Sequence, residues 1–104
     1  MARIRKIRVR HYTRFSRAER IMDEQILRAG VQNKVFVENA RRRLLSPRDA
    51  EERYKLAQGK GNAVIEFDVD LNELQYQLNP IIRGEEFYLK GDVDLKNRNP
   101  IQVR

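Results

Sequence analysis

The chain has 104 residues, of which 40% are hydrophobic and 36% are charged, so we expect a single domain spanning residues 1–104 with one modest core. No stretch approaches the roughly 20 apolar residues of a membrane helix, and the first residues lack the apolar run of a secretory signal, so no membrane insertion is expected. Cysteine is absent and histidine occurs once, which excludes disulfides, thiolate nucleophiles and histidine-rich zinc sites.

The net charge of +7 is spread unevenly along the chain. Residues 1–60 hold 17 Lys/Arg against 7 Asp/Glu, whereas residues 61–104 hold 5 against 8. This distribution attracts anions to the first half of the chain. It does not choose between nucleic acid, a dinucleotide and an acidic partner protein.

The first strand is predicted from the alternation of apolar and basic residues that begins at Ile4 and reaches His11. A helix is expected over residues 15–25, because Ser16 and Glu19 have the spacing of a capping box.

The middle of the chain predicts a second strand over residues 34–38 and a second helix over residues 46–56. Ser46 is the expected cap of that helix, and Pro47 suits its first turn. The clearest alternating strand pattern covers residues 63–69. The remaining expectations are a short strand or loop at 26–30, a helical turn at 70–73, a break at Asn79-Pro80, strands near 87–89 and 93–95, and an edge strand near 101–103. The order of elements predicts an α+β fold with antiparallel pairing.

Several segments together resemble a known family. The tripeptide His11-Tyr12-Thr13 ends the first strand and is followed by a helix, which looks like the opening of small mono-ADP-ribosyltransferase toxin domains. The segments 34–40 and 45–51 resemble the C-terminal toxin modules of bacterial Rhs-type polymorphic toxins. Residues 62–70 and 84–95 continue the likeness, which therefore covers nearly the whole chain.

The resemblance implies a split, two-sheet β core with flanking helices that cradles NAD+, as a substrate, in a cleft without a metal. His11 would anchor the adenosine ribose or nearby backbone, and Glu86 would be the catalytic residue that bonds the 2′-hydroxyl of the nicotinamide ribose. Glu86 is preferred to Glu85 because it directly precedes an aromatic and apolar strand. A carboxylate there gains strength as the ribose acquires positive charge, so it favours the transition state.

The remaining cofactor contacts are open at this point. Tyr12 would stack on the nicotinamide, but its side chain alternates with that of His11, so Tyr54 or Phe36 could supply the stacking face instead. Arg10 is a candidate for the pyrophosphate, since guanidinium matches its oxygens, and Arg14 and the Arg41–Arg43 run are alternatives. Thr13 completes the NAD+-binding tripeptide.

The chain departs from the family pattern at two places. No Ser-Thr-Ser motif occurs on the second strand, and residue 84 is Gly, so the usual Gln-x-Glu or Glu-x-Glu arrangement is missing. Both departures leave the acceptor chemistry open. Structural interpretations also stay open: His11 as a core histidine, and Glu85-Glu86 as solvated charges beside a turn.

The resemblance further implies an antibacterial toxin that is secreted as part of a larger delivery protein and acts in the cytoplasm of the target bacterium. Its acceptor would be a protein or RNA, with elongation factor Tu the first to test, and a cognate immunity protein would neutralise it. The alternative hypotheses are a metal-independent ribonuclease toxin that uses His11 with Glu86 as acid and base, and a basic nucleic-acid-binding module.

Overall fold

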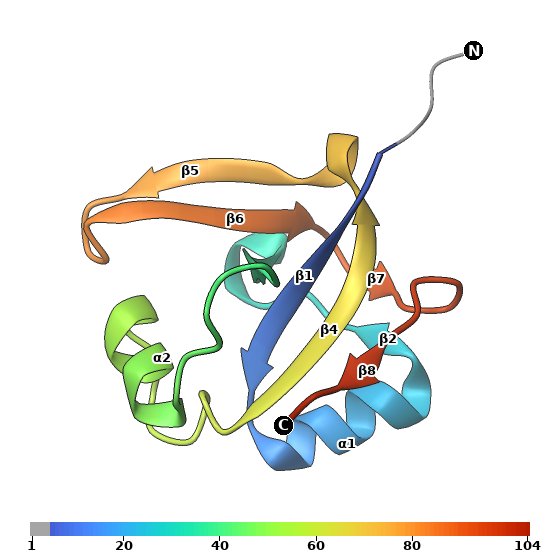
Figure 1. Cartoon of the computed structure of the whole chain (residues 1–104), viewed down its shortest axis with the longest axis horizontal. Coiled ribbons are helices and arrows are strands. Elements are labelled where there is room, and N and C mark those ends of the chain that lie inside the picture. The colour runs from blue at the N-terminus through green and yellow to red at the C-terminus, as the bar shows by residue number, and fades with distance from the viewer. Residues whose placement is uncertain (1–4) are drawn as a thin grey trace.

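The computed structural model describes residues 5–104, and the predicted start of the first strand at Ile4 lies outside them. Six antiparallel strands form one sheet in the order β5-β6-β3-β1-β4-β8, and β2 pairs with β7 in a separate two-stranded ladder (Figure 1). The strands are β1 Lys6–Thr13, β2 Ile26–Leu27, β3 Lys34–Asn39, β4 Ala63–Asp70, β5 Gln75–Asn79, β6 Gly84–Lys90, β7 Val93–Asp94 and β8 Ile101–Gln102. The helices are α1 Phe15–Glu24 and α2 Pro47–Tyr54, with short 3-10 turns at Val31–Asn33 and Leu71–Glu73. The α+β prediction is confirmed.

The centre of the sheet is the long pair β1–β4, which runs in register from Lys6 opposite Asp70 to Thr13 opposite Ala63. Because side chains alternate along a strand, Val9 and its partner Phe67 lie on one face, and both are fully buried. Ala18 and Ile21 of α1 belong to the same buried cluster. The core therefore lies between α1 and this face of the sheet.

The sheet is weakly joined between β1 and β3. Two register pairs connect these strands, Val9 with Asn39 and Arg10 with Glu38, whereas the rest of β3 pairs with β6. Figure 1 shows the consequence: β1 and β4 run diagonally through the centre of the view, whereas β5 and β6 run nearly horizontally along its top. This division agrees with the expectation of a split β core.

The two helices begin in different ways. Ser46 caps α2 as predicted, because its Oγ accepts a hydrogen bond of 3.1 Å from the Asp49 amide. The capping box predicted for α1 is wrong: α1 already includes Phe15, so Ser16 lies inside the first turn, and no side chain caps this helix. Gln25 ends α1 in the left-handed conformation, with its amide bonded to the Ile21 carbonyl at 2.7 Å.

The edge strand β5 is absent from the sequence prediction. Its residues do alternate, with Tyr76 and Leu78 between Gln75 and Gln77, but this apolar face is not buried, because Tyr76 and Leu78 are 65% and 75% exposed. The predicted break at Asn79-Pro80 marks the end of this strand. Within residues 5–104, no helix has the length and hydropathy needed to cross a membrane.

Candidate functional site

Five of the seven predicted site residues share one face of the molecule, opposite the core. The register pairs Arg10 with Glu38, so alternation places Arg10, Tyr12 and Glu38 on one face. Phe36 lies two residues from Glu38 and pairs with Tyr88, and Glu86 lies two residues from Tyr88. Tyr54 reaches this face from α2 by bonding Glu38. We call the side of the sheet that carries Arg10, Tyr12, Phe36, Glu38 and Glu86 the polar face.

At the junction of the two sheet halves, the polar face holds a buried charged cluster around Glu38. The Glu38 side chain is 5% exposed and that of Arg10 is 4% exposed. Arg10 Nη1 lies 3.2 Å from Glu38 Oε2, and Tyr12 Oη donates to the same oxygen at 2.8 Å. Tyr54 Oη donates to the other oxygen, Oε1. We call Arg10, Tyr12, Glu38 and Tyr54 the Glu38 cluster.

The Glu38 cluster fixes α2 and the loop before it onto the sheet. Tyr12 Oη accepts a hydrogen bond of 3.1 Å from the Leu45 amide, and Arg10 Nη2 donates to the Ala40 carbonyl at 2.5 Å. Burial raises the pKa of both Tyr12 and Tyr54, and the neighbouring Glu38 raises it further, so both hydroxyls stay protonated as donors. The predicted contacts Arg10, Tyr12 and Tyr54 therefore do meet, but around a carboxylate that the sequence prediction overlooked.

Glu86 is held in one orientation by two side-chain amides. Its Oε1 accepts from Gln77 Nε2 at 2.6 Å and from Asn79 Nδ2 at 3.1 Å. Within the described residues no hydrogen bond or ion pair occupies its Oε2. Glu85 points to the opposite face and is exposed. Glu86 is thus a half-buried carboxylate with one restrained and one available oxygen.

An exposed aromatic surface adjoins Glu86. Phe36 is 38% exposed, and its ring centroid lies 6.2 Å from that of its partner Tyr88. Phe36 and Glu86 are diagonal neighbours on antiparallel strands, a geometry that separates their backbones by about 7–8 Å. Lys34 Nζ lies 4.4 Å from the Tyr88 ring centroid, so Tyr88 already has a cation on its ring. Phe36 is the aromatic side chain available for stacking next to Glu86.

His11 and Thr13 belong to the other face of β1. His11 pairs with Ile65, and its Nδ1 lies 2.8 Å from the Phe36 carbonyl of β3. Burial, with a smaller contribution from the Arg17 charge, lowers the pKa of His11. Since a carbonyl only accepts, a neutral imidazole with its proton on Nδ1 fits this contact. Thr13 is 4% exposed. Alternation assigns His11 and Glu86 to opposite faces, and in the described part of the chain no hydrogen bond joins them.

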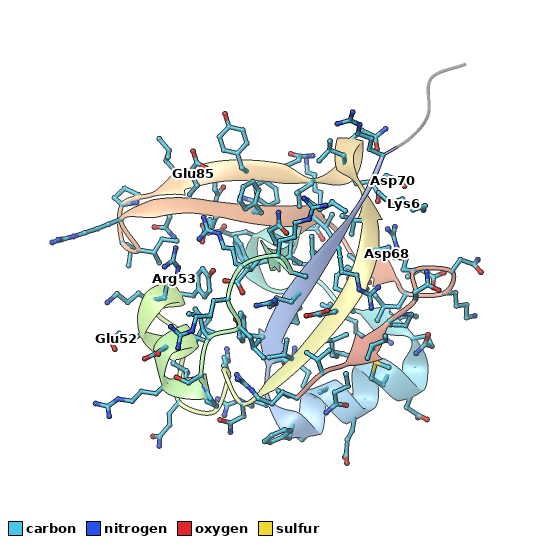
Figure 2. The ribbon with its side chains drawn as sticks, viewed as in Figure 1. Lys6, Glu52, Arg53, Asp68, Asp70 and Glu85 are labelled. Atoms are coloured by element: carbon cyan, nitrogen blue, oxygen red, sulfur yellow. The ribbon has the colours of Figure 1, made fainter. Side chains whose placement is uncertain are left out.

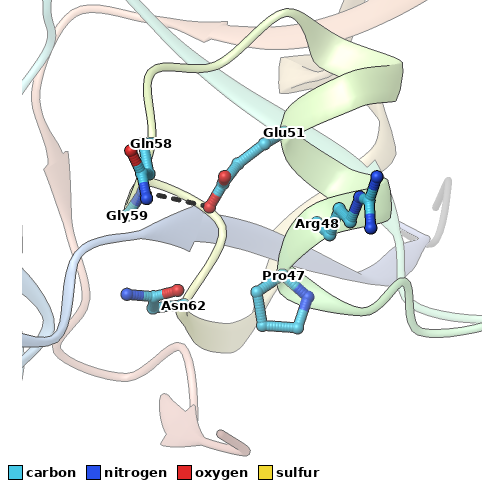
Figure 3. A pocket seen from close by; sticks show the side chains of 6 residues that line it. All are labelled: Pro47, Arg48, Glu51, Gln58, Gly59 and Asn62. Carbon is cyan, nitrogen blue, oxygen red and sulfur yellow. Dashed lines mark hydrogen bonds between the residues drawn. The ribbon is translucent and has the colours of Figure 1, made fainter.

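Two hollows lie on either side of α2. The first is lined by its beginning and the following loop (Figure 3), and there Glu51 Oε2 accepts from the amides of Gly59 and Gly61 at 3.1 and 3.2 Å. That carboxylate closes the loop. The second is a groove of about 750 Å³ between the end of α2 and the β5–β6 hairpin. Figure 2 shows Glu52 and Arg53 on α2, below the strand that carries Glu85. Among residues 5–104, no three His, Asp or Glu side chains gather as metal ligands would.

Comparison with known proteins identifies the family. No curated protein and no solved structure is significantly similar to this chain. A family model of toxin-type enzymes, described as the HYD1 signature containing ADP-ribosyltransferase, matches residues 9–99. The match begins within β1, includes His11-Tyr12-Thr13 and extends beyond β7, so it covers every element described above except β8. The chain therefore belongs to the HYD1-signature ADP-ribosyltransferase family of toxins.

Proposed function

We propose that this domain cleaves NAD+ and transfers ADP-ribose to a macromolecular acceptor, with Glu86 as the catalytic residue. The observation that carries the proposal is the state of the Glu86 carboxylate. Gln77 and Asn79 restrain one oxygen, the other has no partner among the described residues, and the exposed ring of Phe36 lies on the next strand. A restrained carboxylate beside an aromatic surface suits a cationic ring joined to a ribose.

The chemistry follows from the charge that develops during bond cleavage. As the bond between nicotinamide and ribose breaks, its electrons leave with the nicotinamide and the ribose becomes oxocarbenium-like. Glu86 Oε2 would accept a hydrogen bond from the 2′-hydroxyl and stabilise that cation. Because Glu86 is already oriented, little reorganisation opposes this contact in the transition state. The acceptor nucleophile then bonds the anomeric carbon and releases its proton to the solvent, so the products are the ADP-ribosylated acceptor, nicotinamide and a proton.

His11 would act by organising the backbone beside the substrate. Its hydrogen bond to the Phe36 carbonyl crosses the place where β1 and β3 separate. This contact supports the part of the expected role that concerns nearby backbone, rather than direct contact with the adenosine ribose. Arg10, with 4% exposure and its Nη atoms engaged, would contribute through the Glu38 cluster.

We also propose the biological setting that the family resemblance suggested. The domain would be carried on a larger Rhs-type delivery protein and act in the cytoplasm of the target bacterium. A protein or RNA acceptor, with elongation factor Tu tested first, would receive the ADP-ribose. A cognate immunity protein would neutralise the domain, and the excess of basic residues in positions 1–60 favours an acidic inhibitor surface.

The test is transfer of label from adenine-labelled NAD+ to macromolecules in a bacterial lysate, together with release of nicotinamide. Glu86→Gln keeps the volume of the side chain and removes the charge, so we expect it to lose transfer while retaining the wild-type melting temperature. Glu85→Gln should retain transfer, because that carboxylate points to the opposite face. Glu19→Gln is the matched control, because Glu19 is an exposed carboxylate of α1 that lines neither hollow. Full activity in Glu86→Gln would refute the catalytic assignment, and absence of NAD+ cleavage by the wild type would refute the reaction.

A further inference from the structure

The groove between α2 and the β5–β6 hairpin is rich in unpaired cations. Its lining includes four basic side chains, from the loop before α2, the end of α2 and the hairpin turn: Arg42, Arg53, Lys55 and Arg83. All four are exposed. In the described part of the chain, no carboxylate oxygen lies within 4.0 Å of their side-chain nitrogens. Two acids, Glu52 and Glu85, also line the groove, which leaves an excess of positive charge.

The groove also has a fixed aromatic wall. Tyr54 lines it, and its hydroxyl is bound to the buried carboxylate of Glu38. The Arg53 guanidinium carbon lies 5.8 Å from the Tyr54 ring centroid. A ring that is held at its hydroxyl end loses little conformational freedom when a planar group stacks on it. The groove thus combines an oriented ring with cations on both walls.

The groove adjoins the proposed catalytic carboxylate. Gly84 and Glu85 form part of its lining, and Glu86 is the next residue of β6. Tyr54 packs onto the polar face, which is the face that carries Glu86. A ligand of dinucleotide size could therefore extend from the groove to Glu86. The volume of about 750 Å³ is within the range of about 300–1,000 Å³ that is usual for small-molecule sites.

We infer that this groove holds the diphosphate of NAD+, with Arg53 of α2 and Arg83 of the hairpin turn closing on it from opposite walls. The inference rests on the proposed function, and it assigns the diphosphate to residues other than Arg10. A diphosphate presents several oxygens that two guanidinium groups can bind in pairs, which suits unpaired arginines better than lysines. The Tyr54 ring then faces the part of the dinucleotide next to the diphosphate.

The test is isothermal titration with ADP-ribose, which carries the diphosphate but leaves no bond to cleave. Arg53→Gln and Arg83→Gln should each weaken binding about tenfold, because each removes a charge-assisted contact. Arg48→Gln is the matched control: Arg48 is an exposed arginine of the same helix that lines the other hollow, so its removal should leave the affinity within about twofold. Binding by the wild type should weaken as salt is raised.

The outcomes separate this inference from the proposed function. If Arg53→Gln and Arg83→Gln bind ADP-ribose as the wild type does while NAD+ is still cleaved, the groove is not the diphosphate site and the proposed function stands. If the wild type binds ADP-ribose through these arginines but Glu86→Gln retains transfer, the groove stands and the catalytic assignment fails. If a 12-nucleotide single-stranded RNA binds the wild type and displaces no ADP-ribose, while its own binding is lost in the two variants, the groove takes nucleic acid instead and the inference is overturned.

Discussion

Removal of the Glu38 carboxylate is the sharpest test of the polar face. The Arg10 side chain is 4% exposed, and in Glu38→Ala it would keep, among residues 5–104, only the Ala40 carbonyl and Glu66 Oε2, which lies 3.5 Å from its Nε. Breaking a buried ion pair by deleting one partner costs about 3–5 kcal/mol. Glu66 and Ala40 remain near Arg10, but the hydroxyls of Tyr12 and Tyr54 also lose their acceptor, so we expect a loss of at least about 3 kcal/mol of unfolding free energy.

The expected loss is large relative to the whole stability of such a domain, which is typically about 5–15 kcal/mol. In a chain of this size, about 3 kcal/mol corresponds to a fall in Tm of roughly 12–24 °C. Urea denaturation followed by circular dichroism measures the free energy, and differential scanning calorimetry measures the Tm. Glu52→Ala, which removes an exposed carboxylate from the same helix as Tyr54, is the control and should change the stability by less than about 0.5 kcal/mol.

A double-mutant cycle separates the pair from the individual side chains. Arg10→Met combined with Glu38→Leu replaces both buried charges with apolar groups, so neither is left unpaired. We expect the double variant to lose less unfolding free energy than the single variants Arg10→Met and Glu38→Leu lose together, by at least about 1 kcal/mol. Additive losses, or a Glu38→Ala loss below about 1 kcal/mol, would show that the Glu38 cluster does not stabilise the attachment of α2 in the way its geometry indicates.

Three further predictions concern other parts of the fold. The pKa of His11 in the folded chain is lowered from 6.5, so the unfolded chain binds a proton more readily and stability should fall as the pH drops below about 6.5. The urea midpoints measured at pH 7 and at pH 5 should therefore differ less in His11→Gln than in the wild type. Hydrogen bonds from Arg98 lower the pKa of Glu73 from 4.5. The ionised Glu73 therefore stabilises the fold above pH 4.5, and this contribution is lost as the pH falls below that value. The Tm of Glu73→Gln should fall less than that of the wild type when the pH is lowered below 4.5. Gly61→Ala would place a methyl group against the Pro47 carbonyl oxygen, so a Tm fall of several degrees is expected, and an unchanged Tm would contradict that packing.

The strands with regular alternation could be predicted from sequence, because alternation is a local property. Residues 63–69 and 34–38 alternate or are rich in β-branched residues, and they form β4 and most of β3. The strand β5 carries the same signal, because Tyr76 and Leu78 alternate with Gln75 and Gln77, but the sequence prediction missed it. Its neighbour β6 supplies its backbone hydrogen bonds, and its apolar face stays exposed, which local alternation does not reveal.

The Glu38 cluster illustrates a different limit. Glu38 follows Val35-Phe36-Val37 in a strand, and a carboxylate in such a strand is usually expected at a solvated position. Its burial becomes explicable when the register sets it opposite Arg10 and α2 brings Tyr54 to its other oxygen. Sequence indicates which residues are charged, but partner strands and helices decide which charges are buried together.

The division of His11-Tyr12-Thr13 between two faces follows from the same physics. Consecutive strand residues point in opposite directions, so a tripeptide on one strand cannot present all three side chains to one ligand. Tyr12 lies with Glu38 and shares the face of Glu86, whereas His11 lies on the face of Ile65 and reaches the backbone of β3. If NAD+ binds on the polar face, His11→Ala should act through the position of Phe36. It should therefore weaken NAD+ binding in titrations more than it slows single-turnover cleavage of bound NAD+. A loss confined to the cleavage rate would place His11 at the reacting atoms and would contradict this division.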